Sequence, residues 1–171
     1  NVIFNISVDP NTPVGTNVIF PFDLTDQIYT HQTDFTENVG IINEDYETGD
    51  FTNYSWIQGT YPWTVDANQI YEGVYSSRSA DNLPHNQESE LSVEVDVLTP
   101  GDISLYKFVS SEFNFDFLKF KINGNKVGEW SGEDSVWSFV SFPVVNTGLH
   151  TFKWEYDKDA SWSDGDDCAW I

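Results

Sequence analysis

Apolar and polar residues alternate with a period of two along most of this chain, and this alternation limits its fold more than any other feature. A clear case runs from Leu91 to Val97, where every second residue is polar. A strand with one buried face has this pattern. No segment keeps the i, i+3, i+4, i+7 spacing of an amphipathic helix over several turns. We therefore expect an all-β protein, folded as a β-sandwich or jelly roll.

Turn-forming residues separate the alternating segments at short intervals. The turn at 99–102 predicts that strands 91–98 and 103–110 are adjacent in one sheet. Asn123-Gly124 predicts a hairpin, because both residues tolerate positive φ. Further strands are expected over 115–122, 126–130, 137–145 and 149–156, the last two joined as a pair by the turn at 146–148.

The first forty residues have a pattern of their own. Segments 2–8 and 18–24 alternate on either side of a turn at 9–15, and a polar strand is expected over 29–39. We interpret residues 1–40 as the C-terminal strands of an immunoglobulin-like sandwich, with the seam at Val39-Gly40. So few strands leave apolar faces and a strand edge exposed. We therefore expect these strands to pair with the rest of their own domain, with the jelly roll or with another chain.

The charge of the chain excludes two kinds of partner. Twenty-eight Asp and Glu stand against seven Lys and Arg, for a net charge of −21. This charge repels nucleic acid and anionic lipid, and it attracts cations such as Ca²⁺. No run of 18 apolar residues is present, so no membrane insertion is expected. The chain has no Met, so we expect it to be a piece of a longer protein.

Catalytic motifs are missing from the sequence. The histidines, at His31, His85 and His150, stand in none of the common catalytic motifs. Carboxylates are so numerous that a pair of them carries no signal without geometry. The one cysteine, Cys168, precedes Ala169-Trp170-Ile171, which predicts a buried and unreactive thiol. We therefore expect that the chain is not an enzyme.

Short motifs in a fixed order connect residues 41–171 to a known family. They occupy 44–51, 62–65, 71–76, 109–112, 116–120, 128–132, 150–154 and 166–171. In order and spacing they resemble a MAM-like jelly-roll module of secreted proteins of the Bacteroidetes, such as gingipain-like and subtilisin-like proteases. The resemblance implies a concanavalin-like sandwich whose closing strand is truncated at Ile171. Trp162 departs from the family pattern, because it stands in a loop where small residues are usual.

The resemblance also implies a structural calcium ion as a cofactor. In such modules the ion ties the first strand to the last. The matching positions here are Glu47, the loop at Glu72 and Gly73, and Asp167. Carbonyl groups and water would complete a shell of six to eight oxygens. The alternative is that Glu47 only caps a turn.

Tryptophans near turns are the candidate ligand-binding residues. Trp63, Trp130 and Trp162 could stack on sugar rings or anchor a protein partner, or else seal loops over the core. Trp154 and Trp170 lie in strand patterns and are expected in the core. The predicted function is a non-catalytic binding or accessory module of a secreted or cell-surface protein, which recognises glycan or extracellular protein. The alternative is a structural spacer or stabilising segment of a surface adhesin or secreted protease, in contact with neighbouring domains.

Overall fold

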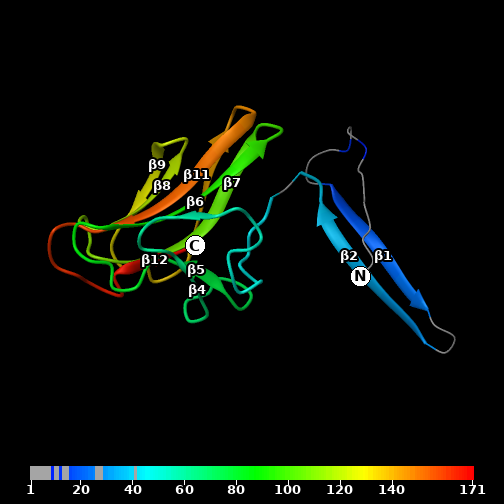
Figure 1. Cartoon of the computed structure of the whole chain (residues 1–171), viewed down its shortest axis with the longest axis horizontal. Coiled ribbons are helices and arrows are strands. Elements are labelled where there is room, and N and C mark those ends of the chain that lie inside the picture. Colours follow the sequence, from blue (N-terminus) through cyan, green and yellow to red (C-terminus); the bar gives the residue numbers. More distant parts are fainter. Residues whose placement is uncertain (1–8, 10–11, 13–15, 26–28, 41) are drawn as a thin grey trace. The chain divides into compact units, whose positions relative to one another are not determined.

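The computed structural model describes residues 9, 12, 16–25, 29–40 and 42–171. The chain divides into two compact units, Asn1–Asn43 and Glu44–Ile171. Figure 1 shows that the described elements are strands, as predicted, and none of the described residues lies in a helix. Accordingly, no described segment is a helix long and apolar enough to span a membrane.

The first unit contains an antiparallel hairpin. Strands β1 (Asn17–Thr25) and β2 (Thr30–Asn38) pair along their whole length. Phe20 and Phe35 lie opposite each other with ring centroids 6.3 Å apart. The first of these strands was predicted from the alternation at 18–24 and the second as a polar strand over 29–39, whereas the predicted strand at 2–8 lies outside the described residues. The assignment of residues 1–40 to an immunoglobulin-like domain stays a prediction.

The second unit is a sandwich of two five-stranded sheets in which every named pair of strands is antiparallel. One sheet, here called the β7 sheet, has the order β10 (Ser138–Val144), β7 (Gly101–Ser110), β12 (Cys168–Trp170), β5 (Ser76–Arg78) and β4 (Thr64–Asp66). The other, the β11 sheet, has the order β3 (Ile57–Gln58), β6 (Glu88–Val97), β11 (Gly148–Asp157), β8 (Phe117–Ile122) and β9 (Asn125–Trp130). The predicted all-β sandwich is confirmed.

Aromatic rings dominate the core between the sheets. Phe120 of β8 is fully buried, and its ring centroid lies 5.0 Å from that of Trp154 and 5.3 Å from that of Phe142. Phe152 and Tyr156 share the inner face of β11 with Trp154, as the period of two predicts. Burial of such rings is the main stabilising contribution in a domain of this size.

Two predicted strand pairings are wrong. Strand β6 pairs with β11, and β7 pairs with β10 and β12, so the turn at 99–102 carries the chain from one sheet to the other. The turn at 146–148 crosses between the sheets in the same way. The residues of these two turns only reverse the chain, whereas the partner strand is chosen by distant residues. The Asn123-Gly124 hairpin between β8 and β9 is confirmed, with φ of 50° and 79° at these residues.

Candidate binding face

The outer face of the β7 sheet carries a continuous set of aromatic rings, here called the aromatic face. It comprises Tyr71, Tyr106, Phe108, Trp137, Phe139 and Trp170. The register of the sheet brings these residues together from four separate segments. Tyr106 of β7 lies opposite Phe139 of β10, and Phe108 of β7 lies opposite Trp170 of β12. Leu105 and Val109 alternate with them and pack into the core.

The exposed part of the aromatic face is a row of three rings. Tyr71, in the loop between β4 and β5, stacks on Tyr106 with centroids 3.6 Å apart and planes at 15°. Phe139 follows with its centroid 5.2 Å from that of Tyr106. The exposed fractions are 47% for Tyr71, 37% for Tyr106 and 58% for Phe139. Large apolar rings held at these exposures offer a rigid surface to a ligand.

Trp137 and Phe108 link this exposed row to the buried ring of Trp170. The centroid of Trp137 lies 6.0 Å from that of Tyr71 and 5.9 Å from that of Phe108. The indole Nε1 of Trp137 is buried and has no hydrogen-bond partner. A buried N–H without an acceptor costs stability.

Polar groups border the aromatic face at Trp170. Its Nε1–H donates to Oδ2 of Asp66 at 2.7 Å, and the guanidinium of Arg78 lies 5.3 Å from its ring centroid. Burial raises the pKa of Asp66, but hydrogen bonds from Trp170 and Asn68 more than offset this and hold that pKa below its usual value. Asp66 therefore stays ionised at neutral pH. An anion and a cation beside aromatic rings can orient a hydroxylated ligand.

Cys168 lies under this border and is fully buried, as predicted. Arg78 Nε donates to its Sγ at 3.2 Å, yet burial dominates and raises the pKa of the thiol to about 11. Because the thiolate is the reactive form, we expect a thiol reagent to label the folded chain at neutral pH about two orders of magnitude more slowly than the chain in denaturant. Equal rates in the two states would contradict this prediction.

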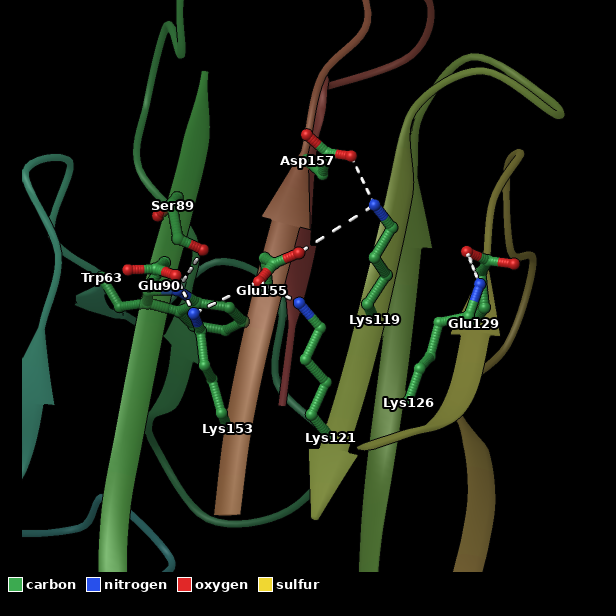
Figure 2. A network of polar contacts seen from close by, with 10 residues as sticks. All are labelled: Trp63, Ser89, Glu90, Lys119, Lys121, Lys126, Glu129, Lys153, Glu155 and Asp157. Atoms are coloured by element: carbon green, nitrogen blue, oxygen red, sulfur yellow. Dashed lines mark hydrogen bonds and ion pairs between the residues drawn. The ribbon is translucent and has the colours of Figure 1, made fainter. Parts of the chain in front are cut away.

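The outer face of the β11 sheet has a different chemistry (Figure 2). The carboxylate of Glu155 is 3% exposed and lies 2.6 Å from Nζ of Lys121 and 3.3 Å from Nζ of Lys153. Lys153 also pairs with Glu90, and Lys119 lies within 3.9 Å of Glu155. Burial raises the pKa of Glu155, but Lys121 and Lys153 hold it below its ordinary value. This face is charged and paired within itself, so it offers little apolar area to a ligand.

The predicted ligand-binding tryptophans do not form one surface. Trp63 is 2% exposed, and its Nε1–H donates to the carbonyl of Ser89 at 3.2 Å, so its ring has no free face. Trp130 is half-buried at the end of β9, where Nζ of Lys107 lies 5.7 Å from its ring centroid. Trp162 is 75% exposed in the loop between β11 and β12. None of the three belongs to the aromatic face.

The predicted calcium ligands are brought together only in part. Oε1 of Glu47 accepts hydrogen bonds from the N–H groups of Val74 at 2.8 Å and Tyr75 at 3.0 Å, so Glu47 does contact the loop that follows Glu72. Two backbone N–H donors on one carboxylate oxygen are compatible with a side chain that only holds the loop in place, and equally with a metal ligand. Asp167 instead pairs with Lys158 and accepts from the hydroxyl of Tyr156 at 3.0 Å. Its carboxylate is thereby occupied, and a calcium ion at Glu47, Glu72 and Asp167 stays a prediction.

Comparisons with known proteins place the fold. No family model and no curated protein matches the chain. The carbohydrate-binding module TmCBM61, solved in complex with β-1,4-galactotriose, is similar with a TM-score of 0.51 and 18% identity, over 77% of this chain and 97% of the module. The secreted serine protease VesC from Vibrio cholerae is similar with a TM-score of 0.53 and 14% identity, over 85% of this chain and 29% of the protease chain. At these identities the similarity shows the fold alone, which is a jelly-roll β-sandwich.

Proposed function

We propose that this chain is a non-catalytic extracellular module that binds glycan on the aromatic face. The observation that carries the proposal is the exposed row of Tyr71, Tyr106 and Phe139, fixed by the register of β7 and β10. Sugar rings present C–H groups on their faces and hydroxyls at their edges. Aromatic rings pack against the C–H faces, and a few oriented polar groups bind the hydroxyls.

The polar groups of the site are few. Asp66 brings a negative charge to the border, but its oxygens already accept hydrogen bonds from Trp170, Asn68 and Gln69, and Nε1 of Trp137 is buried. Arg78 lies on the same face, but Asp81, Cys168 and the Trp170 ring already contact its guanidinium. The site thus offers large apolar area and few polar groups, a composition typical of ligand-binding sites.

Two further observations support an extracellular accessory role. One similar structure is a carbohydrate-binding module, and another is a secreted protease in which the similar part is 29% of the chain. A module of this kind would be one part of a longer secreted or cell-surface protein. If no glycan binds, the alternative role as a spacer or stabilising segment is favoured.

The proposal is tested by binding measurements with defined sugars. We expect isothermal titration calorimetry to detect binding of at least one oligosaccharide in a series that includes β-1,4-galactotriose. Replacing Tyr106 with alanine removes the central ring of the exposed row and is expected to weaken this binding at least about tenfold, as for an aromatic anchor in other interfaces.

Two variants make this test specific. Phe113→Ala removes a ring that is 68% exposed outside the aromatic face, and binding should stay unchanged. Trp162→Ala tests the position favoured by the sequence. A loss of binding in Trp162→Ala, with Tyr106→Ala unaffected, would move the site to the loop between β11 and β12 and overturn the assignment to the aromatic face.

A further inference from the structure

A second cluster of interest lies away from the aromatic face, where the turn after β7 meets the loop after β11. One carboxylate oxygen from each of Glu112, Asp116 and Asp159 lies within 4.8 Å of the other two. Asp116 is fully buried, and the other two residues are half-buried. Three carboxylates at this spacing repel one another unless a proton or a cation lies between them.

Local backbone bonds hold the three residues in place. The N–H of Asp116 donates to the carbonyl of Glu112 at 3.2 Å, and this closed turn sets the two carboxylates side by side. The N–H of Asp159 donates to Oδ1 of Asp116 at 2.8 Å, which brings in the loop after β11. The carbonyl of Asp159 in turn accepts from the N–H of Asn86 at 2.7 Å. The cluster is therefore built into the fold.

The cluster also has oxygens without partners. Oδ2 of Asp116 and Oε2 of Glu112 are buried and accept no hydrogen bond. A buried carboxylate oxygen without a donor is costly, and such an atom in a folded protein calls for a ligand. Asp116 also faces the carboxylate of Asp167, which adds to the repulsion. The nearest ammonium, on Lys158, is bound to Asp167 and donates to Oγ of Ser163 at 2.8 Å.

The other group of close carboxylates in the described residues has no such buried oxygens without a partner. Glu88, Glu90 and Glu155 also have oxygens within 4.8 Å of one another. However, Glu90 pairs with Lys153, and Glu155 pairs with Lys121 and Lys153 (Figure 2). Lysines already neutralise that group, so it does not need a metal ion.

We propose that Glu112, Asp116 and Asp159 bind one divalent cation, with Ca²⁺ the best fit. Calcium takes six to eight oxygens in flexible geometry, and water can complete its shell on the sides of the half-exposed Glu112 and Asp159. Magnesium demands a near-ideal octahedron and gives up its water reluctantly, so it fits less well. The bound ion would join the turn after β7 to the loop after β11. This site is separate from the one predicted at Glu47.

The test is a calorimetric titration of CaCl₂ alone into the full chain, previously freed of metal with EDTA. Asp116→Asn removes one ligand charge and keeps Oδ1 as acceptor for the N–H of Asp159. Binding should weaken at least about tenfold, since even the loss of an indirect partner of a metal ligand has an effect of that size. Glu112→Gln is a second variant, with the same expected loss. Asp102→Asn is the matched control, because it makes the same chemical change at an exposed position of β7.

The position of the site is decided by one more variant, Glu47→Gln. Loss of calcium binding in Asp116→Asn and Glu112→Gln, with Asp102→Asn and Glu47→Gln unchanged, supports the proposal. Binding that is lost in Glu47→Gln and kept in Asp116→Asn places the ion at the position predicted from the sequence and overturns the proposal. An unmodified chain that binds no Ca²⁺ overturns it as well.

Discussion

Phe120→Ala is expected to lower the free energy of unfolding of the Glu44–Ile171 unit by about 3–5 kcal/mol. The ring of Phe120 is fully buried in the centre of the core, in contact with rings from β10 and β11. Truncation loses the transfer free energy of the ring and leaves a cavity. The neighbouring rings of Phe142 and Trp154 belong to strands fixed by long ladders, so the cavity cannot collapse easily.

Urea unfolding followed by tryptophan fluorescence measures this loss selectively, because all seven Trp lie in this unit. Phe139→Ala is the control. It removes the same ring from the outer face of β10, where the side chain is 58% exposed, and should cost about 1 kcal/mol or less. Equal losses in the two variants would show that the core does not lie between the two sheets as described.

The strands could be predicted from the sequence because the signal for a strand is local. Alternation along β6 and β11 reports directly which side chains face the core, and both strands are present as expected. Their partners could not be predicted, because pairing depends on residues far apart in the chain. The clearest case is β12, whose short run Cys168–Trp170 lies between β7 and β5.

The candidate site was harder to predict for the same reason. Tyr71 has no local pattern, and only the folded chain brings it onto Tyr106. Tyr106 and Phe108 do alternate with the core residues Leu105 and Val109, and this was a signal in the sequence for an aromatic outer face. Trp63 was a candidate ligand-binding residue because it lies near a turn, but its ring lies in the core.

The resemblance to a MAM-like module contributed what alternation could not. It implied that Glu47 lies near the loop of Glu72 and Gly73, and the bonds from Val74 and Tyr75 to Glu47 agree with that arrangement. It did not indicate that Asp167 would pair with Lys158. A charge pair depends on side-chain positions that no short motif specifies.

Lys158→Met is expected to lower the free energy of unfolding at neutral pH by about 3–5 kcal/mol, measured in EDTA. The side chain of Lys158 is 3% exposed, and its ammonium pairs with Asp167. Burial raises the pKa of Asp167, but Lys158 and the hydroxyl of Tyr156 more than offset this and hold it below its usual value. Methionine fills a similar volume and removes the charge. The half-buried Asp167 is then left without its ammonium beside Asp116, whose pKa burial and the Asp167 carboxylate already raise to about 6.

The pH dependence of this loss distinguishes charge from packing. In the unmodified chain the lowered pKa of Asp167 contributes stability that is lost only below its unfolded pKa of about 4. In Lys158→Met the ammonium is gone, so burial is expected to raise the pKa of Asp167 above the unfolded value, and protonation then stabilises the variant as the pH falls. The difference between the unmodified chain and Lys158→Met should therefore shrink as the pH is lowered from 7 towards 4. Lys126→Met is the control. It breaks a pair with Glu129 in which the two side chains are 47% and 35% exposed, and should change stability by no more than about 0.5 kcal/mol. A loss in Lys158→Met that is independent of pH would show that Lys158 contributes through its packed stem and not through its charge.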